Sequence, residues 1–149
     1  MDYWGVKSYE NDDSGDALDA GFATVHDKVY EDLMDDRNSL SFEQVQARLA
    51  NTHTLDAAIA ALRKGLDLKE STDEWDETAR LALAGIVVRH AELGVSIPAA
   101  WLNRAIDWLE NEEVEWDEET KRRLRRNKEI DMLRRMDAKG RADQSGKGG

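Results

Sequence analysis

The sequence predicts one all-α domain of five to six helices. Apolar residues recur at three- and four-residue steps over most of the chain, and no segment alternates with the period of a strand. A single proline in 149 residues also favours uninterrupted helices. We expect the helical domain to span 1–138, with a non-helical leader over 1–13. The tail over 139–149 holds no apolar residue larger than alanine and is expected to be disordered.

The first helix is expected from about Ser14 to Met34. Asp13 or Ser14 is placed to cap it, because either side chain can accept hydrogen bonds from the free N–H groups of the first turn. Ser41-Phe42-Glu43-Gln44 is a capping-box pattern that predicts a second helix start. One face of the first helix carries Leu18, Phe22, Val25, Val29 and Leu33.

Three more helices follow the same logic. Thr54 begins one, and a longer helix is expected from near Asp73 to Leu93, ended by Gly94 in a left-handed cap. Ile97-Pro98 starts the next, since proline lacks an N–H that the first turn would leave unpaired. The apolar stripe of the longer helix is formed by Ala79, Leu83, Ile86, Val87 and His90.

A basic helix over 117–138 completes the predicted domain. Residues 1–119 hold 10 Lys and Arg against 28 Asp and Glu, a net of −18, whereas residues 120–149 hold 11 against 4, a net of +7. Three interpretations of this asymmetry are open: the basic helix packs on the acidic body, docks on an acidic protein, or binds nucleic acid through phosphate contacts.

An internal similarity suggests a duplicated helical hairpin across 54–138. Glu74-Trp75-Asp76-Glu77-Thr78 is followed 41 residues later by Glu115-Trp116-Asp117-Glu118-Glu119. Such a period suits stacked helical hairpins. The alternative is that acidic residues with a nearby aromatic suit any helix start, because the helix dipole favours anions there.

The leader carries a tryptophan and an acidic cluster. Asp12, Asp13 and Asp16 have a spacing that can hold magnesium, but the start of a helix explains the same acids without a metal. We therefore expect no metal and no cofactor. The Trp4 indole is expected to cover the bundle; the alternative is an exposed anchor for a partner.

Several function classes lack sequence support. The absence of cysteine excludes disulfides and thiolate chemistry, and the chain has no P-loop, no dinucleotide fingerprint and no Gly-x-Ser-x-Gly motif. His90 lies on an apolar stripe, which favours a hydrogen-bonded core histidine over a catalytic one. No apolar run is long enough to span a membrane, so we expect a cytoplasmic protein.

The leader resembles the N-terminal signature of a family of small bacterial proteins of unknown function. Members begin Trp-Gly-x-Gly-Pro-Phe-Asp-Asn-Asp, and this chain has Trp4-Gly5 and Tyr9-Glu10-Asn11-Asp12, followed by Gly15-Asp16. Lys7-Ser8 replaces the Gly-Pro of the family. The resemblance covers about sixteen residues and implies a small, mostly helical protein, with no activity, ligand or catalytic residue to transfer.

These observations favour a non-enzymatic protein-interaction or regulatory module whose acidic surface meets a basic partner. One alternative is a metal-dependent enzyme built on Asp12, Asp13 and Asp16, with His26 near them. The other is nucleic-acid binding by the basic C-terminal helix. Nucleic acid is not expected elsewhere, because the acidic body repels phosphate.

Overall fold

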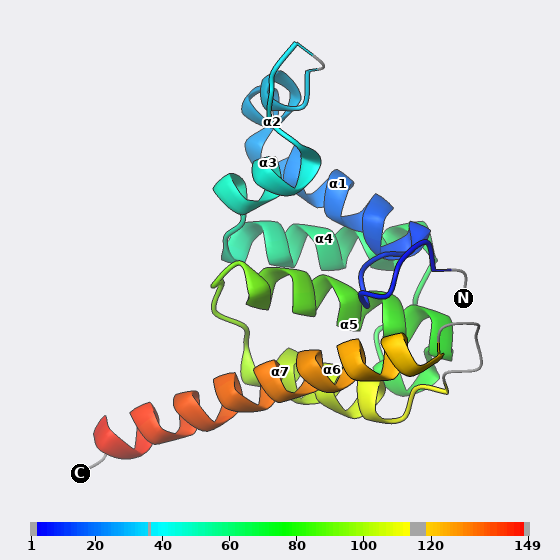
Figure 1. Ribbon diagram of the computed structural model, residues 1–149, viewed down its shortest axis with the longest axis vertical. Helices are drawn as coiled ribbons and strands as arrows, with labels where there is room; N and C mark the ends of the chain where they lie inside the picture. Colours follow the sequence, from blue (N-terminus) through cyan, green and yellow to red (C-terminus); the bar gives the residue numbers. More distant parts are fainter. Residues whose placement is uncertain (1–2, 36, 114–118, 148–149) are drawn as a thin grey trace.

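Helix α5 (Glu77–Glu92) lies at the centre of the computed structural model, between α4 (Thr52–Gly65) and α6 (Ala99–Glu110) (Figure 1). Every residue from Leu81 to Ala91 is buried, so the helix is enclosed on all sides and not on one stripe alone. A helix that is apolar all round suits this central position. The sequence predicted only the stripe because it gives no information about how many neighbours surround a helix.

The structure describes residues 3–35, 37–113 and 119–147, and the side chains of the last segment over 120–137. The described residues form seven α-helices and one 3₁₀ turn, which confirms the all-α class and corrects the expected five to six helices. No helix in these ranges has the length and apolar content needed to cross a bilayer. The remaining elements are α1 (Asp12–His26), α2 (Lys28–Leu33), α3 (Phe42–Leu49), η1 (Thr72–Glu74) and α7 (Glu119–Lys147).

The expected first helix is two helices, and this accounts for the extra element. The chain turns at Asp27, whose φ of 47° interrupts the helix, and α2 then places the Tyr30 ring 5.9 Å from the Phe22 ring. Aspartate adopts a positive φ more readily than most residues. The cap also lies two or three residues earlier than expected: the Asn11 side chain, and not Asp13 or Ser14, accepts from the Ser14 N–H.

The other helix starts are close to expectation. The capping box at Ser41 is confirmed, and a second one at Asn51 starts α4 two residues before Thr54. Gly94 has the predicted left-handed conformation, with a φ of 79°. The predicted helix start near Asp73 is a 3₁₀ turn, and α5 itself begins after its cap at Asp76.

Helix α7 is longer than the basic helix predicted over 117–138. Its backbone is helical to Lys147, which includes most of the tail expected to be disordered, and in Figure 1 this end projects away from the other helices. No proline interrupts the sequence after 138. Extending an existing helix by one residue costs little free energy compared with starting a new helix. Residues 114–118, which hold most of the second copy of the internal similarity, lie outside the described residues.

Helices α1 and α4 pack closely because a glycine lies between them. A Cβ at Gly21 would lie 2.5 Å from the backbone nitrogen of Ala58, closer than two such atoms can approach. The glycine therefore fixes the distance between the two helices. A Cβ added to Gly65, at the end of α4, would have no atom within 4 Å.

We predict that Gly21→Ala lowers the free energy of unfolding by about 1–3 kcal/mol, as overpacking does in a well-packed core. Gly65→Ala should leave it unchanged or raise it by up to about 1 kcal/mol, because alanine is the better helix former. Urea unfolding of both variants measures the two values. Equal effects would contradict the close approach of α1 and α4.

His90 is a buried core residue, in agreement with the sequence analysis. Its Nδ1 lies 3.0 Å from the Ile86 carbonyl oxygen and its Nε2 lies 2.9 Å from the Thr54 hydroxyl. A neutral ring fits both contacts: Nδ1–H donates to Ile86, and Nε2 shares the Thr54 hydroxyl proton with the Asn51 carbonyl oxygen, which lies 2.8 Å from the same hydroxyl. Burial lowers the pKa of His90 below its ordinary value, assisted by the charge of Arg89.

We predict that the protein loses stability as the pH falls below about 6.5, where a histidine of the unfolded chain takes up a proton. The folded protein protonates His90 only at lower pH, so the unfolded state binds more protons in this range. Each pH unit then costs at most about 1.4 kcal/mol. Unfolding at several pH values should show a smaller slope for His90→Gln, and equal slopes would contradict the assignment.

Candidate functional site

The leader folds back on itself before α1 begins. The backbone N–H of Trp4 donates to the Glu10 carbonyl oxygen at 2.9 Å, and Tyr3 pairs with Asn11 in an isolated antiparallel bridge. Gly5 lies under the Glu10 side chain, where a Cβ would be 2.4 Å from the carboxylate. The leader of residues 3–11 is therefore an ordered, closed loop, and α1 starts at Asp12, two residues before the expected start at Ser14.

The leader and the first turn of α1 lie against α5. The Ser14 hydroxyl donates to the Ala82 carbonyl oxygen at 2.8 Å, and the Asn11 amide donates to the Ser8 carbonyl oxygen at 2.9 Å. Where the loop crosses α5, a Cβ at Gly85 would lie 2.6 Å from that Ser8 oxygen. A glycine is therefore required at this crossing. The loop and the two helices form one packed unit.

A buried glutamate of α7 clamps the leader from the other side. Glu129 is 1% exposed, and its Oε2 accepts from both the backbone N–H and the hydroxyl of Ser8, each at 3.0 Å. Its Oε1 accepts from Arg126 at 3.0 Å. Arg126 also donates to the Val6 carbonyl oxygen and to Glu112. Burial opposes the charge of Arg126, but Glu112 and Glu129 raise its pKa, so it stays charged.

A second arginine links α7 to α5. Arg125 pairs with Glu129 at 3.2 Å and with Glu92 of α5. The Tyr9 hydroxyl donates to the same Glu92 carboxylate at 2.7 Å, and burial raises the pKa of this phenol. The network therefore connects the leader, α5, α7 and the segment that follows α6, and it confirms that the basic helix packs on the acidic body.

A cleft of about 230 Å³ opens beside the leader. Four elements contribute its lining, and the Trp4 side chain on its rim is 61% exposed. The expectation that Trp4 packs over the bundle is therefore wrong: the indole lies near Gly15 of α1 but presents most of its surface to solvent. The lining residues are Trp4, Lys7, Tyr9, Glu10, Gly15, Leu18, Phe42, Glu43, Gln46 and Arg89.

Two buried polar side chains lie in the lining of the cleft. The Arg89 Nε donates to the Gln46 Oε1 at 2.8 Å, and the Arg89 guanidinium lies 5.4 Å from the centre of the Tyr9 ring. The Gln46 side chain is 1% exposed, yet its Nε2 has no hydrogen-bond partner among the described residues. Buried polar groups are normally paired, so an unpaired donor in a cleft marks a place where a ligand can supply the acceptor.

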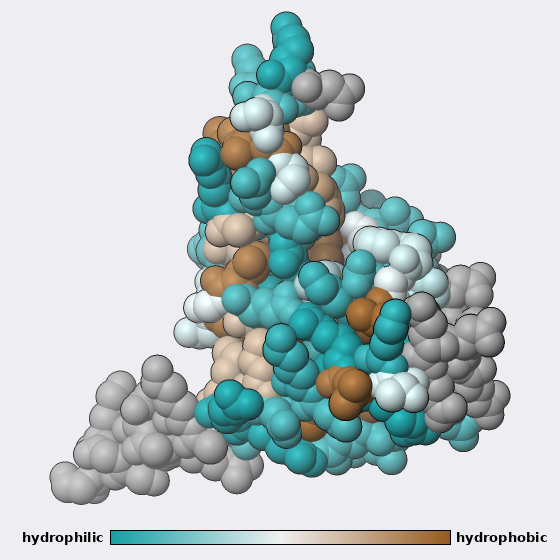
Figure 2. Space-filling view, viewed as in Figure 1, coloured by the Kyte–Doolittle hydropathy of each residue, from teal (hydrophilic) through white to brown (hydrophobic). Residues whose placement is uncertain are grey.

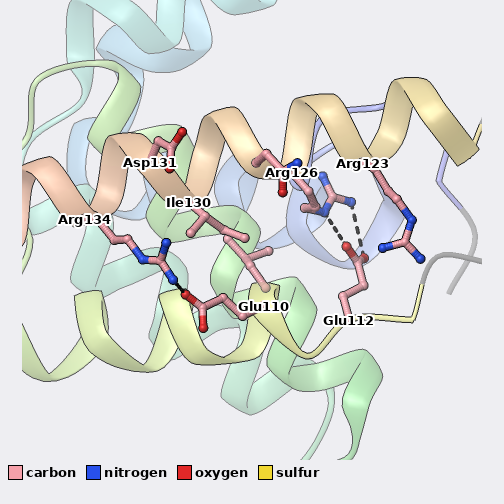
Figure 3. Close-up of a pocket in the computed structure, with 9 residues that line it drawn as sticks. Glu110, Glu112, Arg123, Arg126, Ile130, Asp131 and Arg134 are labelled. Carbon is pink, nitrogen blue, oxygen red and sulfur yellow. Dashed lines mark hydrogen bonds and ion pairs between the residues drawn. The ribbon is translucent and has the colours of Figure 1, made fainter.

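A larger groove of about 380 Å³ lies between α6 and α7, and two arginine–glutamate ion pairs cross it. Figure 3 shows Arg126 and Arg134 of α7 facing Glu112 and Glu110 across this groove. These contacts make the groove a helix–helix interface. The cleft beside the leader combines aromatic walls with an unpaired donor and is the stronger candidate site.

The predicted metal residues do not form a metal site with one another. Among the residues whose positions are described, no three histidine, aspartate or glutamate side chains converge as a metal ion requires. Asp12 and Asp13 lie in the first turn of α1, where the helix dipole favours their charge. His26 contacts the Leu49 carbonyl oxygen at 2.7 Å and belongs to the packing of α1 on α3.

Comparison of the chain with protein-family models, curated proteins and solved structures gave no match. The resemblance of the leader to a bacterial family therefore stays a prediction. Of the six signature residues, Asn11 caps α1 and Trp4, Tyr9 and Glu10 line the cleft.

Sequence analysis missed Arg89, Gln46 and Glu129. Two of them carry a signal that was readable: Arg89 is the one charge within the apolar run 81–91, and Glu129 is the one acid within the basic segment 121–130. A charge in an apolar run is expected to be buried and paired. Gln46 carries no such signal, because its burial follows from the tertiary contact of α3 with the leader and α5.

We predict that Glu129→Gln lowers the free energy of unfolding by about 3–5 kcal/mol, because it removes one charge of a buried pair. Arg134→Gln is the matched control on the same helix. Arg134 and its partner Glu110 are 56% and 37% exposed, so this change should cost less than about 1 kcal/mol. Urea unfolding gives both values, and faster hydrogen exchange at the Ser8 N–H should accompany Glu129→Gln. Similar costs for the two variants would contradict the clamp.

Proposed function

We propose that this chain is a cytoplasmic, non-enzymatic protein-interaction module that binds a basic partner. Its place in the bacterial family that the leader resembles is part of the proposal. The observation that carries it is the cleft beside the leader: an exposed tryptophan and an unpaired buried donor lie within a strongly acidic body. Tryptophan is enriched among the residues that contribute most to protein–protein binding.

The size of the cleft favours a protein partner over a metabolite. Its volume of about 230 Å³ is below the roughly 300–1,000 Å³ of typical small-molecule sites. A space of this size suits one anchoring side chain. Figure 2 shows a face covered mostly by hydrophilic side chains, with hydrophobic ones in small separate patches. This face therefore has no broad apolar area that could itself bind a partner in place of the cleft.

The charge distribution favours a basic partner. Three arginines of α7 are paired with glutamates of the body: Arg125 with Glu92, Arg126 with Glu112 and Arg134 with Glu110. These ion pairs neutralise the three arginines within the chain, which gives nucleic-acid binding by α7 less support. The body retains an excess of carboxylates, since residues 1–119 carry 28 acidic and 10 basic side chains. Such a surface attracts cationic partners and accelerates their association.

The proposal is tested by co-purification from native extract at low ionic strength, where surface charge is least screened. A basic protein should be recovered in stoichiometric amount and released by added salt. Trp4→Ala should reduce the recovery, whereas Val29→Ala, which alters an exposed apolar residue of α2 outside the cleft, should not. Recovery of no stoichiometric partner, or equal recovery by both variants, would count against the proposal.

A further inference from the structure

The walls of the cleft indicate which side chain it accepts. Trp4 from the leader and Phe42 from the start of α3 contribute two aromatic rings, and Tyr9 contributes a third. Aromatic rings pair favourably with one another beyond the area that they bury. An aromatic side chain therefore gains more in this cleft than an aliphatic one of similar size.

The two cationic side chains in the lining of the cleft already contact aromatic or acidic groups of the chain itself. Arg89 and Lys7 both lie over the Tyr9 ring, at 5.4 and 5.8 Å from its centre, and Arg89 Nη1 is 3.7 Å from the Glu92 carboxylate. The cleft therefore offers no unmatched buried cation that would require an acidic ligand. The group of the cleft that lacks a hydrogen bond is the Gln46 Nε2 donor, whose acceptor can be a neutral or an anionic oxygen.

The cleft is lined by two acids and two bases, and one of the bases, Arg89, is paired with Glu92 outside the lining. Glu10 and Glu43 line it, and Asp12 is exposed one helical turn before Gly15. Lys7 is the one lysine of the lining. Residues that flank the anchor in a bound segment thus meet carboxylates, which favours lysine and arginine there.

We infer that the cleft binds a peptide segment in which one aromatic residue is flanked by lysine and arginine. The aromatic ring enters between Trp4 and Phe42, and a backbone carbonyl oxygen of the segment accepts from the Gln46 Nε2. This inference rests on the proposed function and adds the chemistry of the partner. It also accounts for a buried donor that the fold leaves without a hydrogen bond.

The test uses ¹⁵N-labelled full-length protein and two synthetic peptides. Both have the same lysine and arginine flanks; one has a central tryptophan and the other a central serine. We expect the tryptophan peptide to bind about tenfold more tightly or better, the equivalent of about 1.4 kcal/mol. Its titration should shift the Trp4 indole N–H and the Gln46 side-chain amide resonances. Equal affinity of the two peptides overturns the inference and leaves the acidic-surface proposal standing.

Two variants separate the ring contact from the hydrogen bond. Gln46→Glu keeps an acceptor for the Arg89 Nε but removes the free donor, so it should weaken the tryptophan peptide at least fivefold, a typical loss for one buried hydrogen bond of about 1 kcal/mol. Trp4→Ala, at an exposed position that the fold does not need, should abolish the preference for tryptophan. Val29→Ala should change neither. An unchanged affinity of Gln46→Glu for the tryptophan peptide, or an unchanged preference for tryptophan in Trp4→Ala, overturns the inference.

Two further results would separate the aromatic-peptide inference from the broader proposal of a basic partner. Tighter binding of a central leucine than of a central tryptophan overturns the aromatic assignment. If neither peptide binds at low ionic strength, the inference and the basic-partner proposal both fail. Circular dichroism of each variant confirms that it is folded before its affinity is compared.

Discussion

The contact between the Glu129 carboxylate and Ser8 is the interaction on which the N-terminal part of the structure depends. Two hydrogen bonds from Ser8 and two from arginines saturate this buried carboxylate. A buried charge without such partners would cost several kcal/mol, so α7 and the leader hold their positions together or not at all. The leader in turn positions Trp4 and Tyr9, and with them one side of the cleft.

The same network explains the uneven charge of the chain. Three arginines, Arg89, Arg125 and Arg126, meet three glutamates, Glu92, Glu112 and Glu129, over adjoining surfaces of α5, α7 and the segment that follows α6. Opposite charges within one chain thus neutralise one another where they are buried. The acids that remain lie mainly on the exposed surface, where they attract cations without a desolvation cost.

The leader combines two roles that are usually separate. Its Asn11 cap and Ser8 contacts are structural, since they satisfy backbone groups and a buried carboxylate. Trp4 and Tyr9 belong to the cleft, where Gln46 keeps a donor without a partner. Natural sequences tend to violate the rule of paired polar groups at sites that bind something. The violation here coincides with an exposed tryptophan, and this coincidence distinguishes the cleft from the larger groove, which two ion pairs cross.

The sequence by itself determined the all-α class, the capping box at Ser41, the left-handed Gly94 and the core position of His90. These features depend on neighbours in sequence or on apolar periodicity, which act over one or two helical turns. The break at Asp27, the burial of Gln46 and the clamp at Glu129 were decided by tertiary structure. The last two depend on residues far apart in the chain: Gln46 meets Arg89 across 43 positions and Glu129 meets Ser8 across 121, distances over which local propensity carries no information. Trp4 shows the same limit, because its exposure follows from how Ser8 and Glu129 fasten the leader.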